Sequence, residues 1–348
     1  MTKRITRALL RATTLAAAAF AAAGGAAAPA PGTNINAQLK GDLVPVHDPV
    51  LTREGDTYYV FGTGVPGATG QYVLSRTSKD MLNWRAAGPL FTRIPAWASQ
   101  AVPGTREIWA PDISYWGGKW HLYLAFSTFG SNRSAIGLFT SPTLDPKKPG
   151  YGWKDEGLVV QSTEADDFNA IDANHVIDRD GRHWLVLGSF WTGIKLFELN
   201  PATGKLKNPG AAPVPLARRR APAGGPAPVE APFIIDHGGD YFLITSYDYC
   251  CKGVNSTYYT VVGRSKSITG PYLGEDGSSL MDGEGTILIR ADLQEQQRFR
   301  GPGHAGVYRE DGRDFIAYHA YDRQNKGAST LRISEIMWTA DNWPRVKM

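Results

Sequence analysis

The stretch WAPDISYWGGKWHLYL, residues 109–124, contains the pattern that decides the fold. A short motif that ends in Asp112 comes first, a pair of glycines follows, and a run of aromatic and aliphatic residues completes the unit. Glycine pairs permit tight turns, and aromatic and β-branched residues are typical of strands. The stretch therefore predicts two strands that are joined by a turn.

The same unit occurs five times along the chain. Each copy starts from one acidic residue or histidine, which we call its lead residue. The lead residues are Asp48, Asp112, Asp172, Glu230 and His304. They are separated by roughly sixty positions, a period that is typical of a β-propeller when each unit holds several short strands. The sequence thus predicts an all-β chain with a five-bladed β-propeller fold, and an irregular β-sandwich is the competing architecture.

The composition agrees with many short strands. The 348 residues include 39 Gly, 23 Pro, 10 Trp and 15 Tyr, and no long stretch has apolar residues at helical spacing. In a propeller the first strand of each blade lines the central channel, so the five lead residues are expected to converge there. A ring of buried acidic groups is costly unless it is used, which favours a functional site on the axis.

The N-terminus indicates export. Residues 1–30 hold a basic region, a short apolar run and a small-residue cleavage pattern, as in a secretory signal peptide. The apolar run is too short for a comfortable transmembrane helix. We therefore expect a secreted protein that has no membrane attachment after cleavage. Residues 31–41 are expected to be a flexible segment and residues 42–348 the catalytic propeller.

The charge gives no support for nucleic-acid binding. The whole chain has a net charge of +4, from 37 basic and 33 acidic side chains. The basic residues of the expected signal peptide account for that excess, so the mature chain is electrically balanced. We expect a monomer whose partner is a polysaccharide, without nucleic acid.

Several motifs together resemble glycoside hydrolase family 43, and within it the endo-acting α-1,5-L-arabinanases. The motifs are VHDP at 46–49, WAPD at 109–112, NAID at 169–172, GSFW at 188–191, VEAP at 229–232 and GPGHAG at 301–306. Residues 249–265 and 318–322 are similar to further segments of that subgroup. The resemblance extends from about residue 42 to Pro344, and it implies hydrolysis of arabinan, a side chain of pectin.

The resemblance also implies the roles of three carboxylates. Asp48 matches a general base, Glu230 a general acid, and Asp172 a residue that raises the pKa of the acid and orients the substrate. Inverting hydrolysis needs the acid and the base about 6.5–9.5 Å apart, to leave room for a water molecule. Asp112 is not one of the family's catalytic residues, and we interpret it as structural.

Further residues are expected to contact the substrate or a metal. Trp109, Phe190 and Trp191 are candidate aromatic platforms for a sugar ring, and Asn169 and Ser189 belong to motifs of the resemblance. His304 matches a histidine that lies near a hydrated calcium ion on the propeller axis. Physical chemistry alone would not select calcium, because Ca²⁺ prefers oxygen ligands. We expect one Ca²⁺ per chain, with water as most of its ligands.

The two cysteines, Cys250 and Cys251, are adjacent. A disulfide between neighbours would join Cα atoms about 3.8 Å apart, closer than the usual range. Two free thiols are the alternative, and the sequence does not distinguish them.

Rival functions remain within and outside the family. An exo-acting α-L-arabinofuranosidase or a β-xylosidase of the same family is the main alternative, and a non-catalytic sugar-binding propeller is another.

Residues 209–228 are rich in proline and longer than expected between two strands, so they could overhang the cleft.

Overall fold

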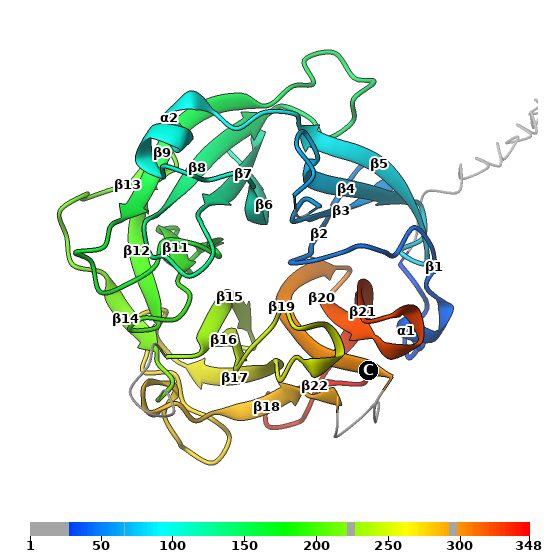
Figure 1. Ribbon diagram of the computed structural model, residues 1–348. Coiled ribbons are helices and arrows are strands. Elements are labelled where there is room, and N and C mark those ends of the chain that lie inside the picture. The colour runs from blue at the N-terminus through cyan, green and yellow to red at the C-terminus, as the bar shows by residue number, and fades with distance from the viewer. Residues whose placement is uncertain (1–27, 66, 221–226, 292–297) are drawn as a thin grey trace, which may run out of the picture.

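The computed structural model describes residues 28–65, 67–220, 227–291 and 298–348. Its strands form five sheets around a central axis, which confirms the predicted five-bladed β-propeller (Figure 1). Most of the expected signal peptide, residues 1–27, lies outside the described residues. Within the described ranges, no helix is both long and apolar enough to cross a membrane.

Each blade is an antiparallel sheet of consecutive strands. Blade 1 consists of β2 (Val50–Glu54), β3 (Thr57–Gly62), β4 (Tyr72–Ser78) and β5 (Asn83–Phe91). Blade 2 consists of β6 (Trp109–Trp116), β7 (Lys119–Phe126), β8 (Ser134–Ser141) and β9 (Lys154–Ser162). Blade 3 consists of β10 (Asn174–Ile177), β11 (His183–Leu187), β12 (Ile194–Asn200) and β13 (Lys205–Leu206). Blade 4 consists of β15 (Val229–His237), β16 (Asp240–Tyr247), β17 (Tyr259–Ser265) and β18 (Thr286–Ile289). Blade 5 consists of β19 (Phe299–Glu310), β20 (Arg313–Asp322), β21 (Ala328–Trp338) and β22 (Pro344–Val346).

Apolar side chains fill the gaps between neighbouring blades. Tyr58 and Trp84 of blade 1, for example, form one buried cluster with Phe315 and Leu331 of blade 5. Equivalent clusters join each remaining pair of adjacent blades. Full burial of such side chains contributes about 1.5–3 kcal/mol each, so the packing between sheets holds the ring together.

Every blade has the same backbone irregularity in or just before its innermost strand. One residue there other than glycine has a positive φ, namely Asp48 (53°), Ala110 (41°), Asp172 (57°), Ala231 (54°) and His304 (49°). In blades 2, 4 and 5 the strand register shifts at this point, as in a β-bulge, which redirects side chains. The residues of blades 2 and 4 that correspond in backbone conformation to Asp48 are thus Ala110 and Ala231. The repeat in the sequence predicted Asp112 and Glu230 at these positions.

The N-terminal segment packs on the ring. Residues 31–41, which we expected to be flexible, contain α1 (Ile35–Gln38) and β1 (Lys40–Gly41), and β1 pairs with β5 in parallel. The buried Asn36 side chain bonds Tyr318, Ser334 and the backbone of Ile333 in blade 5. The segment therefore bridges blades 1 and 5.

Connections between and within the blades hold the remaining short elements. Helix α2 (Ala96–Ala101) lies between blades 1 and 2, and single 3-10 turns follow β16, β17 and β20. The Pro-rich segment 209–228 forms the strand β14 (Val214–Ala217), which pairs with β12. Residues 221–226 of this segment lie outside the described part of the chain.

Candidate active site

Asp48 lies just before β2, where hydrogen bonds from two blades orient its buried carboxyl group. The hydroxyl of Thr63 donates to Oδ2 at 2.5 Å. The Nδ1 atoms of His47 and His304 lie 2.7 and 3.0 Å from Oδ1. Burial alone would raise the pKa of Asp48, but the positive charge and hydrogen bonds of His47 and His304 outweigh it and hold the pKa well below its usual value. Asp48 is therefore ionised across the neutral range.

A second layer of side chains holds this carboxylate. The backbone N–H of Asp48 donates to Nδ1 of His319 at 3.2 Å, and the His319 ring stacks on His47 with 3.8 Å between the ring centroids. Burial lowers the pKa of His319 well below its usual value, so its imidazole is neutral. The backbone N–H of Ala110 donates to the Thr63 hydroxyl at 2.9 Å, which links the site to blade 2.

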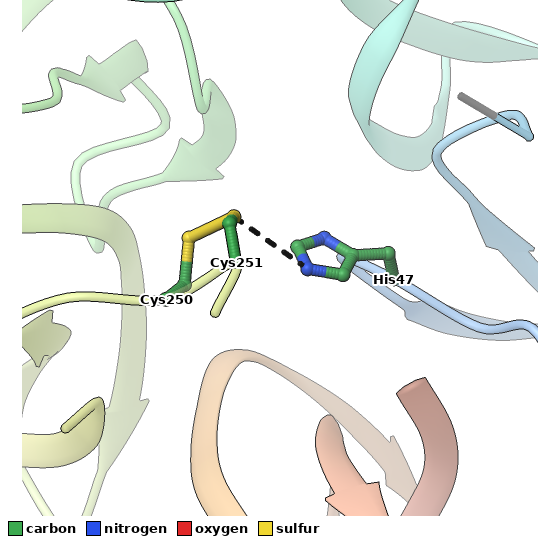
Figure 2. A group of neighbouring side chains, drawn as sticks. All are labelled: His47, Cys250 and Cys251. Carbon is green, nitrogen blue, oxygen red and sulfur yellow. Dashed lines mark hydrogen bonds between the residues drawn. A yellow bond between two sulfur atoms is a disulfide. The ribbon is translucent and has the colours of Figure 1, made fainter. Parts of the chain in front are cut away.

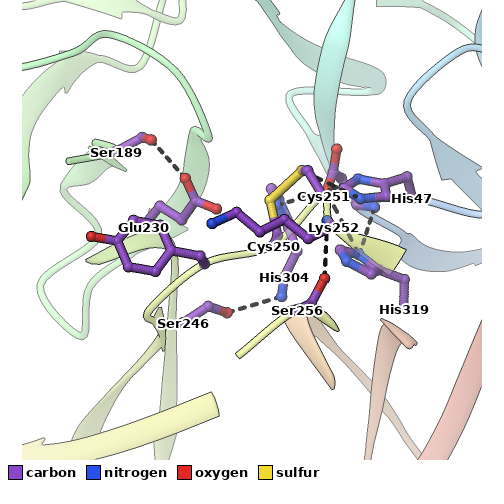
Figure 3. Close-up of a disulfide and its surroundings, with 12 residues drawn as sticks. His47, Ser189, Glu230, Ser246, Cys250, Cys251, Lys252, Ser256, His304 and His319 are labelled. Carbon is purple, nitrogen blue, oxygen red and sulfur yellow. Dashed lines mark hydrogen bonds and ion pairs between the residues drawn. A yellow bond between two sulfur atoms is a disulfide. The ribbon is translucent and has the colours of Figure 1, made fainter. Parts of the chain in front are cut away.

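Glu230 lies at the start of β15 and is also buried. The hydroxyl of Ser189 donates to Oε2 of Glu230 at 2.7 Å (Figure 3), and its predicted contact with substrate stays a prediction. Burial raises the pKa of Glu230, against the opposing hydrogen bond from Ser189. A carboxyl group in this environment keeps its proton to a higher pH than a glutamate in water does.

Asp172 is the third buried carboxyl group. Its Oδ2 accepts the backbone N–H of Ala231, the residue after Glu230, at 3.3 Å. Burial, together with the negative charges of Glu230 and Asp48, raises the pKa of Asp172 to about 8, although the positive charge of His304 opposes this rise. Because ionisation of either Asp172 or Glu230 disfavours ionisation of the other, the pair retains a proton.

The predicted substrate contacts occupy different positions around these carboxyl groups. Trp109 begins β6, and its indole N–H donates to Glu107 at 2.8 Å. The Phe190 ring lies 5.8 Å from that of Tyr249, centroid to centroid. Asn169 is buried, and its side-chain oxygen has no hydrogen-bond partner within the described part of the chain. An unpaired buried acceptor of this kind is costly unless a ligand or water satisfies it.

A small cavity on the axis is lined by residues that follow Asp48, Asp172 and Glu230 in the chain, among them Pro49, Ala173 and Ala231. The lining of this cavity includes His304, Asp112 and Asn174. The volume in which the centre of a water molecule can lie is about 20 Å³. That is enough for one water molecule. Asp112 accepts the Asn174 side-chain amide at 3.0 Å and the His175 backbone N–H at 2.8 Å, which ties β6 to β10. His304 and Asp112 would be the ionisable groups facing a cation here, but space for one water molecule does not accommodate a cation together with most of its water ligands.

The sequence of the whole propeller decides its family. A family model of glycosyl hydrolases family 43 matches residues 44–344. The chain belongs to glycosyl hydrolase family 43. The match spans all five blades and includes the three carboxylates and His304.

Two curated relatives of this chain have names that describe different modes of action. The extracellular endo-α-(1→5)-L-arabinanase 1 of Bacillus subtilis is 42% identical over 300 residues, 86% of this chain and 87% of the relative. The extracellular exo-α-(1→5)-L-arabinofuranosidase of Cellvibrio japonicus is 40% identical over 310 residues, 87% of this chain and 86% of the relative. The crystal structure of an exo-1,5-α-L-arabinanase from a bovine ruminal metagenomic library superimposes with a TM-score of 0.81 at 43% identity, covering 89% of this chain and 99% of that one.

Sequence reasoning missed several residues of this family 43 site. His47 and His319 contact Asp48, and Thr63 and Tyr321 complete its surroundings. His47 lies inside the VHDP motif, and His319 and Tyr321 lie inside residues 318–322, but no role was assigned to them. Thr63 belongs to no motif, and only the fold brings it to the carboxylate.

Proposed function

We propose that this protein is a secreted endo-acting hydrolase of α-1,5-L-arabinofuranosidic bonds in arabinan. The observation that carries the proposal is the division among the buried carboxyl groups. Asp48 is held ionised by two imidazoles, whereas burial raises the pKa of both Glu230 and Asp172, so that this pair retains a proton. Hydrolysis of a glycosidic bond needs one group in each of these states. The names of the extracellular relatives in Bacillus subtilis and Cellvibrio japonicus support the substrate and the export.

In the proposed mechanism, Glu230 donates its proton to the glycosidic oxygen as the bond between that oxygen and the anomeric carbon breaks. Asp48 accepts a proton from a water molecule, and this water attacks the anomeric carbon from the opposite face. The anomeric configuration is therefore inverted. The hydrogen bonds from Thr63, His47 and His304 fix the Asp48 oxygens, so that the base is oriented before the water arrives.

Asp172 acts on the acid in this mechanism. Its negative charge, when present, disfavours ionisation of Glu230 and so raises the pKa of the acid. Its bond to the Ala231 N–H also holds the backbone next to Glu230. The two functions together keep the acid protonated and aimed at the leaving oxygen.

The remaining predicted residues provide substrate contacts in this proposal. The partly buried rings of Trp109 and Phe190 offer apolar faces to the C–H bonds of the sugar. The unpaired oxygen of Asn169 is suited to accept a hydrogen bond from a sugar hydroxyl.

A hydrated Ca²⁺ on the axis is part of the proposal, and it rests on the family resemblance of His304 rather than on the size of the cavity. Such an ion would supply positive charge near the carboxylates. Treatment with a chelator is expected to lower the activity or the melting temperature, and added Ca²⁺ should restore both. No change in either quantity after metal removal verified by elemental analysis would contradict this part.

The proposed function is tested by incubating the purified mature protein with debranched arabinan and following products by chromatography. We expect an early ladder of arabino-oligosaccharides, which is absent with Glu230→Ala. Exo-acting α-L-arabinofuranosidase activity is the second candidate, because exo-acting relatives are 40 and 43% identical. Early arabinose or a single short product would favour that candidate. Turnover of xylan or aryl xylosides in place of arabinan would refute both and favour a β-xylosidase.

A further inference from the structure

Cys250 and Cys251 form a disulfide between neighbouring residues, with 3.8 Å between their Cα atoms. The pair lies in the loop that joins β16 to the 3-10 turn η2 (Gly253–Asn255). Figure 2 shows that this disulfide faces His47, with Sγ of Cys251 at 3.9 Å from Nε2 of the imidazole. The disulfide thus lies beside the partner of Asp48, although it belongs to blade 4 and Asp48 belongs to blade 1.

A chain of hydrogen bonds connects this loop to the carboxylate. The backbone N–H of Cys251 donates to the Tyr321 hydroxyl at 2.8 Å. The same hydroxyl lies 2.8 Å from Nε2 of His47, and Nδ1 of His47 lies 2.7 Å from Oδ1 of Asp48. An amide N–H can only donate, so the Tyr321 oxygen accepts from Cys251 and its own proton is available for His47. Whether the ring is neutral or charged, Nδ1 of His47 then carries a proton and donates it to Asp48.

The members of this chain have little freedom to move. Tyr321 is buried, and the His47 ring stacks on the fully buried ring of His319 at an angle of 25° between the planes. The loop itself is held by hydrogen bonds from the N–H of Lys252 to the Ser256 hydroxyl and across its base. The orientation of Asp48 therefore depends on groups that are themselves fixed.

The disulfide controls the first donor of the chain. A disulfide between adjacent residues closes a small covalent ring, and the peptide bond between the two residues is a member of that ring. The N–H of this peptide bond is the one that donates to Tyr321. Because the peptide unit is planar, the ring fixes the direction in which this N–H points. Cys251 also has a positive φ of 66°, which a linear chain adopts only at a cost.

We propose that the Cys250–Cys251 disulfide and His47 are positioning elements for Asp48, which act through the hydroxyl of Tyr321. This inference rests on the proposed role of Asp48 as the general base. A general base must be held within about 0.5 Å of its productive geometry, and side chains around it commonly provide that restraint. Loss of this series of hydrogen bonds is expected to slow the chemical step and to leave substrate binding almost unchanged.

The variant Tyr321→Phe removes only the bridging hydroxyl. We expect kcat on debranched arabinan to fall about fivefold to tenfold, the rate equivalent of one ordinary hydrogen bond, with KM unchanged. Tyr318→Phe is the matched control, because this buried tyrosine of the same strand receives its hydrogen bond from Asn36. It should keep the wild-type kcat. A rise in KM with unchanged kcat in Tyr321→Phe would contradict the proposal, since it would assign the hydroxyl to substrate binding.

A double-mutant cycle tests whether the disulfide acts through Tyr321. Cys250→Ser/Cys251→Ser should lower kcat by a similar factor, and its combination with Tyr321→Phe should cause no further loss. Losses that multiply would overturn the inference, because the disulfide would then act independently of the hydroxyl. His47→Asn, which keeps a donor near the position of Nδ1, should retain more activity than His47→Ala. Equal losses in the two His47 variants would also contradict it.

Two controls separate this inference from the proposed function. If the wild-type protein does not cleave arabinan, or if Asp48→Ala is as active as the wild type, the proposed function fails and the inference fails with it. If the wild type is active and Asp48→Ala is inactive, but the Tyr321 and cysteine variants have wild-type kcat, only the inference is overturned. Melting temperatures of all variants identify any loss of activity that results from unfolding.

Discussion

The hydrogen bond between Ser189 and Glu230 allows a quantitative prediction about the acid. In Ser189→Ala the hydroxyl that donates to Oε2 at 2.7 Å is lost, while the backbone of the GSFW motif remains. This hydroxyl favours the ionised carboxylate and lowers the pKa of Glu230. Removal of the hydroxyl should therefore raise that pKa further. Since the acid works in its protonated form, the basic limb of the pH–activity profile should move to higher pH.

The size of the shift follows from hydrogen-bond energies. A hydrogen bond to a charged group contributes about 1.5–3 kcal/mol, and one to a neutral group about 0.5–1.5 kcal/mol. The difference between the ionised and protonated states of Glu230 is then about 1.4 kcal/mol, which corresponds to about one pKa unit. The assay is kcat/KM on debranched arabinan as a function of pH, because this parameter reports the pKa values of the free enzyme.

A matched control removes a serine hydroxyl elsewhere. Ser127 is buried in blade 2, where its hydroxyl bonds that of Ser134 at 2.7 Å. Ser127→Ala should cost stability without moving the basic limb. A basic limb in Ser189→Ala that stays in place, or that moves to lower pH, would refute the assignment of Glu230 as the acid that controls this limb.

Two further predictions concern charge and stability. Asp172→Asn removes the carboxyl group that shares a proton with Glu230, so Glu230 should ionise more easily and the basic limb of the kcat/KM profile should move to lower pH. A shift to higher pH would contradict the role of Asp172. Asn36→Ala removes the hydrogen bonds to Tyr318 and Ser334 and leaves the Ile333 N–H unpaired. This should cost about 2–3 kcal/mol and lower the melting temperature by several degrees in calorimetry, whereas an unchanged melting temperature would show that the N-terminal segment does not hold the ring.

The blades could be predicted from the sequence because their signals are local and repeated. A turn glycine followed by an apolar strand, as in residues 117–124, depends on neighbours in the chain, and five copies reinforce one another. The carboxylates could be found for a similar reason, since Asp48, Asp172 and Glu230 lie within short motifs of a family resemblance. The structure places all three in buried positions near the axis, but their catalytic roles stay predictions.

The other features of the fold and of the site could not be predicted, because they depend on contacts between distant parts of the chain or on very short elements. The bulges that align Ala110 and Ala231 with Asp48 involve alanines, which leave no recognisable mark in the sequence. The helix α1 has only four residues, too few for a helical period. The environment of Asp48 comes from residues such as His319, which lies 271 positions away along the chain. A pattern search cannot tell such a buried neutral histidine from a core residue.

The stereochemistry of hydrolysis tests the central claim most directly. The first product released from debranched arabinan can be followed by proton NMR at its anomeric position, before the sugar interconverts in solution. The division between Asp48 as base and Glu230 as acid predicts that the new reducing end first has the inverted, β configuration. A first product with the retained α configuration would contradict the account, because a carboxylate would then attack the sugar itself.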